Sequence, residues 1–149
     1  MVLLFGILAA MSSKPHLTPE KLFKNKLPAE WSTAKIAFIC FTPLPKGFLP
    51  YIKEVAQERY FLHSPNSEVH LCEFDGNSFI VVSEVYGFAV GTTTVEELIH
   101  YGVEYIIGIG YAGAFNGAQV GKRFVAQDTM SDLAIAAHYG VDAFGPKVA

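Results

Sequence analysis

The sequence has little of what several large classes of protein require. Its 149 residues contain two cysteines, and 11 lysines and arginines stand against 14 acidic residues, which gives a net charge of −3. Two cysteines are too few for a disulfide framework, and Cys40 and Cys72 stand inside apolar runs, so we expect buried thiols. The acidic balance and the lack of any lysine or arginine run argue against a nucleic-acid partner.

Motifs for metals and nucleoside triphosphates are also missing. No H-E-x-x-H, C-x-x-C or G-x-x-x-x-G-K-[ST] pattern is present. A zinc hydrolase or a P-loop protein therefore has no support, and we expect no metal.

No apolar run is long enough to cross a bilayer, so we expect no membrane association. Residues 2–11 have the length of a signal-peptide core, but no positive charge precedes them. We expect residues 1–16 to be a leader, disordered or signal-like, followed by one domain over residues 17–149. A cytoplasmic location is expected, with secretion as the alternative if residues 1–11 act as a signal peptide.

What the sequence does contain is an alternation of apolar runs and helical periodicities. It predicts an α/β fold with a mixed β-sheet flanked by helices. Strands are expected over residues 35–41, 68–74, 78–86, 104–109 and 123–127, with a hairpin turn at Asp75-Gly76. Helices are expected after Thr18-Pro19, over residues 47–57, and from a capping box at Thr93-x-x-Glu96 to Gly102, with Glu96 and Glu97 facing solvent.

The stretch Gly108–Gly113, G-I-G-Y-A-G, has the spacing of a dinucleotide-binding fingerprint. That fingerprint needs a helix directly behind it, whose N-terminus holds the pyrophosphate. Gly117 and Gly121 interrupt the residues that follow, so we expect no such helix and no NAD. From local physics, the glycines either bring backbone amides up to a ligand or form a plain turn.

A resemblance to a known family favours the interpretation in which the glycines approach a ligand. In residues 86–128 the chain is similar to the purine/uridine phosphorylase superfamily of nucleoside phosphorylases. The matching residues are Gly87, Glu96-Glu97-Leu98, Gly102-Val103, Gly110, Gly113 and Val120-Gly121. The segments LTPEKLF, KIAFICFTPLPK, EFDG and SDLAIAAHYG, the last with His138-Tyr139, resemble uridine phosphorylase-like members more loosely.

The resemblance implies a partial phosphorylase/hydrolase-like fold and cleavage of the N-glycosidic bond of a nucleoside, uridine-type or purine, by phosphate. It implies a small-molecule nucleoside partner, a homo-oligomer, and no cofactor other than inorganic phosphate as co-substrate. The residues it implies for substrate binding are Tyr86, Gly87, Thr92, Gly110, Tyr111 and His138, with Lys46 for phosphate. It identifies no catalytic residue.

The chain departs from the family at the phosphate. Gly108 stands where the family has an arginine, Tyr111 replaces a small hydroxyl residue, and the loop F-T-P-L-P leaves only Lys46 nearby. Family chains also continue well past this length, so we expect a fragment or a degenerate copy. Two alternatives stay open: a nucleosidase, in which water replaces phosphate, and a non-catalytic nucleoside-binding remnant.

Overall fold

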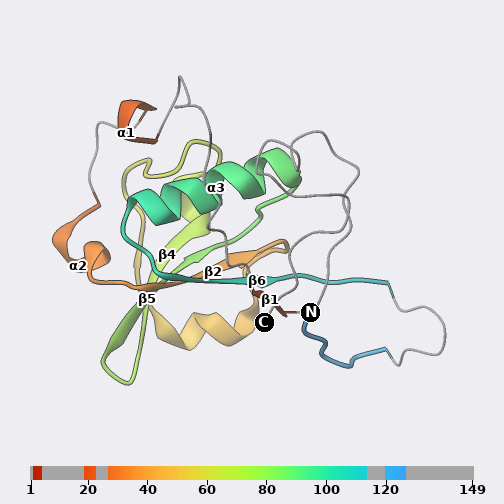
Figure 1. The fold of residues 1–149 in the computed structure, drawn as a ribbon. Helices are drawn as coiled ribbons and strands as arrows, with labels where there is room; N and C mark the ends of the chain where they lie inside the picture. Colours follow the sequence, from red (N-terminus) through yellow and green to blue (C-terminus); the bar gives the residue numbers. More distant parts are fainter. Residues whose placement is uncertain (1, 5–18, 23–26, 114–119, 127–149) are drawn as a thin grey trace.

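A computed structural model describes residues 2–4, 19–22, 27–113 and 120–126 of the chain. These residues form an α/β fold built on a mixed six-stranded sheet with the strand order β1-β6-β2-β5-β4-β3 (Figure 1). The strands are β1 (Val2–Leu4), β2 (Ile36–Cys40), β3 (Ile52–Val55), β4 (Val69–Phe74), β5 (Asn77–Val82) and β6 (Tyr105–Ile109). The helices are α1 (Pro19–Leu22), α2 (Ala29–Ser32) and α3 (Phe88–His100), with 3-10 helices η1 (Lys46–Tyr51) and η2 (Asn66–Glu68). The predicted α/β class is confirmed.

The middle of the sheet is parallel. β2 pairs in parallel with β5 on one side and with β6 on the other, so that Ala37 stands opposite both Ile80 and Ile106. The pairs β5–β4, β4–β3 and β1–β6 are antiparallel. Three strands therefore end at one edge of the sheet, which we call the carboxyl edge.

Alternate residues of the strands bury into two cores, as the period of two along a strand requires. On one face Ile39, Ile80 and Leu98 belong to a cluster that α3 covers, and each is 0–1% exposed. On the other face Cys40, Cys72 and Val81 are fully buried beneath η1. Helices thus cover both faces of the sheet, α3 on one side and η1 on the other (Figure 1).

The hairpin between β4 and β5 forms as predicted. Asp75 and Gly76 have φ values of 50° and 75°, which a tight hairpin turn requires at both central positions. The side-chain amide of Asn77 donates to the Asp75 carbonyl at 3.0 Å and closes the turn.

The prediction of a helix over residues 47–57 is wrong. The chain forms the 3-10 helix η1 and then the edge strand β3, which pairs with β4 from Ile52↔Cys72 to Val55↔His70. Pro50 lacks the N–H that a continuing α-helix would need, and β-branched Ile52 and Val55 suit a half-covered strand. Phe48 and Ile52 have helical spacing in the sequence, yet both pack against the same face of the sheet without a continuous helix.

Helix α3 begins five residues before the predicted capping box, so that prediction is also wrong. Gly87 is the N-cap, and Thr93 and Thr94 lie inside the helix. Their hydroxyls donate back to helix carbonyls, Thr94 to Val90 at 2.8 Å, which is the local bonding that lets threonine satisfy itself within a helix. The predicted end is confirmed, because Gly102 has a φ of 88° directly after the last turn.

Near the two ends of the chain, the predicted elements agree only in part with the observed ones. Pro19 opens α1 as expected, and Val2–Leu4 pair with β6, whereas α2 and β1 were not predicted. Of the strand expected over residues 123–127, only Val125 forms a β-bridge, and residue 127 lies outside the described part. No helix within the described ranges combines the length and apolar character needed to cross a membrane.

Candidate functional site at the carboxyl edge

The carboxyl edge joins the exits of three parallel strands. After β2, the Phe41 N–H donates to the Ile109 carbonyl at the end of β6 (2.8 Å). After β5, the Glu84 N–H donates to the Thr42 carbonyl (2.9 Å). From there the chain diverges: β2 leads to η1 on one face, and β5 leads to α3 on the other (Figure 1). In open α/β sheets such a divergence at the carboxyl ends leaves the crevice where ligands bind.

Phe41 sets the spacing between α3 and the exit of β6. A Cβ built on Gly91, in the first turns of α3, would lie 3.6 Å from Phe41 Cε1, and one built on Gly110 would lie 3.5 Å from Phe41 Cβ. The ring therefore packs against both backbones. Because neither position carries a side chain, the start of α3 and the glycine stretch after β6 can each approach Phe41 closely.

The N-terminus of α3 opens onto this edge without a side-chain cap. Gly87 has a φ of 88° and makes no side-chain cap hydrogen bond, and the Gly91 N–H is bonded back to the Gly87 carbonyl at 3.0 Å. The N–H groups of a first helical turn and the helix dipole favour an anion or a carbonyl oxygen at such an end. The geometry suits a polar ligand.

Four of the substrate-binding residues expected from the resemblance lie at this edge. Tyr86 and Gly87 follow β5, and Gly110 and Tyr111 follow β6. Tyr86 is 54% and Tyr111 86% exposed, so neither ring is part of the core. The prediction that they could touch a ligand stays open.

The other three expected residues are placed differently. Thr92 is half-buried in the second turn of α3, behind the free end of the helix. Lys46 opens η1 with its side chain exposed, beneath the sheet face opposite α3. His138 lies outside the described residues. Residues 114–119, on which a nucleotide-binding helix would have to begin, also lie outside them.

Large apolar side chains are exposed around the same edge. Tyr86, Phe88 and Tyr111 flank the strand exits, and Phe124 belongs to the described segment 120–126; each is at least 46% exposed. Tyr86 and Phe88 flank the N-cap Gly87 in the sequence, so two exposed rings belong to the start of α3, and exposed apolar patches often mark binding surfaces. Flat rings can stack on a flat ligand such as a nucleobase.

One charged residue at this edge was not expected from the sequence. Glu84 follows β5 with a φ of 56°, a left-handed conformation that only a few per cent of residues other than glycine adopt, and its side chain is exposed. No pattern in the sequence marked Glu84.

The expectation that Glu97 faces solvent is wrong. It is 3% exposed rather than solvent-facing, and its Oε1 accepts the Leu62 N–H at 3.1 Å. Burial raises the pKa of this carboxyl to about 7, and the neighbouring charge of Glu96 adds to the effect. Because Glu97 lies in the second half of α3, away from the carboxyl edge, we assign it to holding residues 60–62 against the helix.

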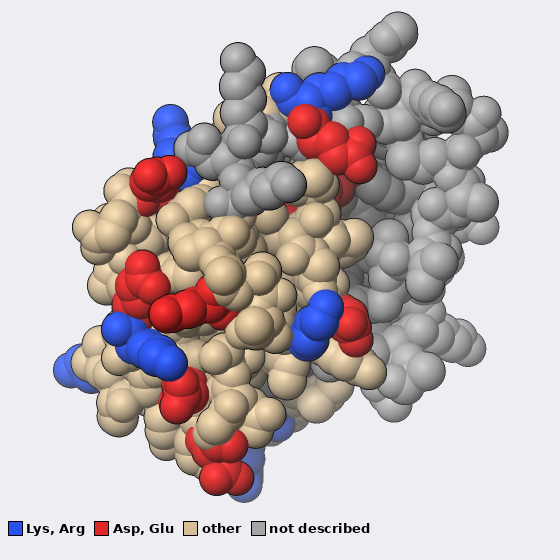
Figure 2. Space-filling view, turned by 90° about the vertical axis from the view of Figure 1, so that its left-hand side faces the viewer, with Lys and Arg blue, Asp and Glu red and all other residues tan. Residues whose placement is uncertain are grey.

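The remaining chemistry of the described residues is sparse. Cys40 and Cys72 are free, buried thiols as predicted, and burial raises the pKa of Cys40 to about 12 and that of Cys72 to about 11. Within the described ranges no three histidine, cysteine or acidic side chains gather as metal ligands would. Figure 2 shows acidic and basic side chains interspersed on the face it presents.

Comparison with known proteins gives a viral relative. The chain is 41% identical over 128 residues to an uncharacterised protein of Acanthamoeba polyphaga mimivirus, and the match covers 84% of this chain and 51% of the relative. The chain therefore spans about half the length of the curated relative that it matches. No family model and no solved structure matches the sequence.

Proposed function

We propose that this chain is a nucleoside phosphorylase-like protein whose carboxyl edge binds a nucleoside, uridine-type or purine, and cleaves its N-glycosidic bond with phosphate. The observation that carries the proposal is the convergence of three parallel strand exits, the uncapped end of α3 and exposed aromatic rings at one edge. The resemblance in residues 86–128 supplies the reaction class.

This reaction depends on the positions of phosphate and nucleoside more than on a reactive side chain. A phosphate oxygen forms a bond to C1′ of the ribose while the bond from C1′ to the base nitrogen breaks and its electron pair leaves with the base. The products are ribose 1-phosphate and the free base. The transition state resembles an oxocarbenium ion, so that an anion held beneath C1′ and donors near the departing base lower the barrier.

The edge offers groups suited to each part of the substrate. Aromatic rings such as Tyr86 and Phe88 can stack on a base, and the exposed backbone at Gly87, where a Cβ would meet no atom within 4 Å, can approach a sugar or an anion closely. The nucleoside and a homo-oligomer that completes the site are parts of the same proposal.

Hydrolysis is the second candidate, and Glu84 favours it. An exposed carboxylate at the exit of β5 could accept a proton from water attacking C1′. The strained backbone of Glu84 is consistent with a functional constraint, since such conformations cluster at active sites. A non-catalytic nucleoside-binding protein is the third candidate, because Gly108 stands where the phosphorylase motif has a phosphate-binding arginine.

The experiment measures release of free base from uridine and from inosine by chromatography, with and without inorganic phosphate. Release that depends on phosphate, together with ribose 1-phosphate in stoichiometric amount, is the expected result. Release at the same rate without phosphate would replace the phosphorylase with the hydrolase. If no base forms but either nucleoside raises the melting temperature, the chain is a binding protein and the catalytic proposal is wrong.

A further inference from the structure

Strand β3 forms one edge of the described sheet. It comes last in the strand order and pairs with β4 alone, so that one side of its backbone faces no other strand among the described residues. Backbone groups on an open edge are a template on which a further strand can pair, and natural proteins usually protect such edges with charges or bulges. What this edge accepts therefore depends on the side chains of β3, Ile52–Val55.

The apolar residues of β3 share one face of the sheet. Ile52 stands opposite Cys72 on β4, and both belong to the cluster beneath η1. Val55 stands opposite His70, which shares the face of Cys72 because alternate residues of a strand point the same way. Exposed apolar side chains, Leu49, Tyr51 and Phe74, lie beside the strand, and the rings of the last two meet edge to face at 5.3 Å. Exposed apolar patches of this kind often mark an interface.

The charged residues of β3 turn together to the opposite face. The pairing with β4 shifts register before Glu54, so that Lys53 is an extra, bulged residue. Lys53 Nζ lies 2.7 Å from an oxygen of Glu73, which alternates with Cys72 along β4. Glu54 Oε2 accepts the indole N–H of Trp31 at 2.8 Å, and Trp31 belongs to the core that α3 covers. Lys53 and Glu54 therefore both project on the α3 side of the sheet.

We propose that β3 is the interface for a second copy of this chain, paired antiparallel about a two-fold axis that passes between Lys53 and Glu54. The order of β3, apolar, positive, negative and apolar, is self-complementary in this arrangement. Lys53 of each copy stands opposite Glu54 of the other, and Ile52 stands opposite Val55. Directly opposite residues of an antiparallel pair share a face, so two ion pairs form on the α3 side and two apolar pairs on the η1 side.

The charges specify the register as well as the partner. Opposite charges directly across an antiparallel pair are favourable, and like charges are unfavourable. A shift by one residue would place Lys53 opposite Lys53, or Glu54 opposite Glu54. An ammonium group has three donors and a carboxylate has two acceptor oxygens, so both groups can keep their partners within the chain while they pair across the axis.

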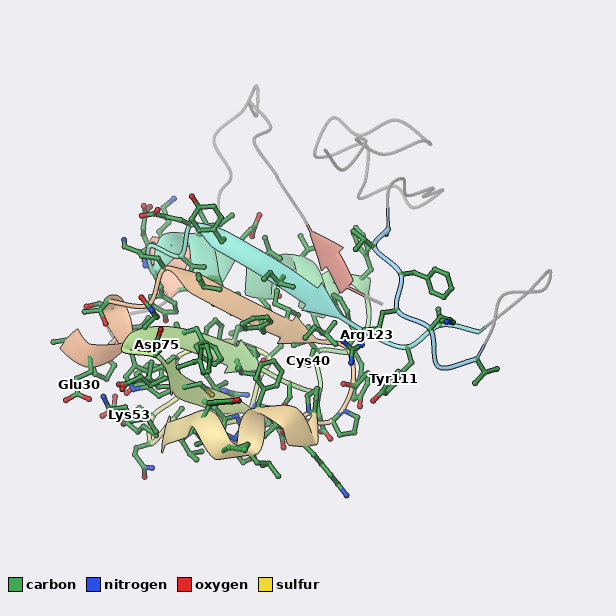
Figure 3. All side chains as sticks on the ribbon, turned by 90° about the horizontal axis from the view of Figure 1, so that it is seen from below. Glu30, Cys40, Lys53, Asp75, Tyr111 and Arg123 are labelled. Atoms are coloured by element: carbon green, nitrogen blue, oxygen red, sulfur yellow. The ribbon has the colours of Figure 1, made fainter. Side chains whose placement is uncertain are left out.

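The inference goes beyond the proposed reaction and does not depend on it. Strands β4, β5 and β2 separate β3 from β6, and Figure 3 shows Lys53 far from Tyr111. Substitutions in β3 therefore leave the residues that we propose for nucleoside binding in place.

Analytical ultracentrifugation of the full chain over a range of concentrations measures the equilibrium between monomer and dimer, and a dimer is expected. Lys53→Glu sets carboxylates against Glu54 of the other copy, and Glu54→Lys sets ammonium groups against Lys53. Each variant alone is expected to dimerise about tenfold more weakly or worse. An equimolar mixture of the two variants again places opposite charges in both pairs and is expected to form a heterodimer.

Lys35→Glu is the matched control, because Lys35 is also an exposed lysine paired with an acid, Glu104 at 3.2 Å, but lies outside β3. It is expected to leave the dimer unchanged. Circular dichroism establishes that each variant is folded, and the comparison of Lys53→Glu with Lys35→Glu stands even if Glu54→Lys, which loses the bond to Trp31, does not fold.

Three results would overturn the inference. A chain that is monomeric at every concentration leaves this edge to a strand of another protein. A dimer on which Lys53→Glu and Lys35→Glu have the same effect forms elsewhere, and folded variants that do not associate on mixing exclude the proposed register. Base release is measured on the same samples: a dimer without release keeps the interface and removes the phosphorylase, whereas release by a monomer removes the interface alone.

Discussion

At the scale of single residues, Glu97 connects the stability of the fold to pH. Its carboxyl is buried in α3 and accepts the Leu62 N–H, and burial raises its pKa from 4.5 to about 7. The folded state therefore favours the protonated form. The stabilisation is complete below the unfolded pKa and is lost as the pH rises through the folded pKa.

We predict that the free energy of unfolding falls by about 2–3 kcal/mol between about pH 5 and pH 8 because of Glu97. Glu97→Gln keeps an oxygen for the Leu62 N–H and removes the charge. The variant should be more stable than the unaltered chain at the higher pH and should lose this slope. Urea denaturation followed by fluorescence of Trp31, the single tryptophan and fully buried, measures the effect.

Glu30→Gln provides the control, since Glu30 is an exposed acid on the short helix α2 (Figure 3). His70 acts in the opposite direction: burial lowers its pKa, so that its contribution to stability is lost as the pH falls. Subtracting the curve of Glu97→Gln from that of the unaltered chain removes the contribution of His70. A difference curve that stays flat would contradict the assignment to Glu97.

At the scale of elements, the start of α3 depends on Gly87. Its φ of 88° is a conformation that residues with a side chain adopt at a cost, yet a Cβ there would meet no atom within 4 Å. Gly87→Ala should therefore lower the free energy of unfolding by about 1–2 kcal/mol through backbone strain alone. Urea denaturation of the purified variant measures the change.

Gly47→Ala is the matched control, because Gly47 also has open space around its Cβ position but no positive φ. This variant should be neutral or slightly more stable, since alanine reduces the entropy of the unfolded chain. Equal destabilisation by both substitutions would show that the conformation of Gly87 is not the cause.

Several elements could be predicted from the local sequence alone. The continuous apolar runs over residues 35–41 and 104–109 led directly to the parallel strands β2 and β6, because strands covered on both faces need apolar residues throughout. The Asp75-Gly76 turn was equally clear, since few residue pairs accept its backbone angles.

The wrong predictions concern segments whose local sequence fits more than one structure. Residues 47–57 have apolar residues at helical spacing, but pairing of Ile52 with Cys72 on β4 made the second half a strand, and only the tertiary fold contains that information. Thr93 and Glu96 fit a capping box, but Gly87 caps the helix earlier. For the same reason Glu84 was missed: its place at the carboxyl edge arises from the strand order, which no local pattern encodes.

At the scale of the whole molecule, the strands whose ends form the carboxyl edge also carry the buried core residues. Cys40 on β2 and Cys72 on β4 lie on either side of β5, are 0% exposed, and pack in one cluster with Val81. A reagent can reach either thiol only if the sheet opens around β5. Their pKa values, raised by burial to about 12 and about 11, further suppress the reactive thiolate in the folded state.

We predict that both thiols of the folded protein react with a disulfide reagent at one slow rate, set by global unfolding. The variants Cys40→Ala and Cys72→Ala each leave a single thiol, so the two rates can be compared by absorbance of the released thiolate. Once each rate is corrected for the stability of its variant, the rates should agree and rise together with added urea, and both thiols should react at once in concentrated guanidinium chloride. Fast labelling of Cys72 alone, insensitive to urea, would instead mean that β3 and β4 open separately while the parallel strands that form the carboxyl edge stay intact.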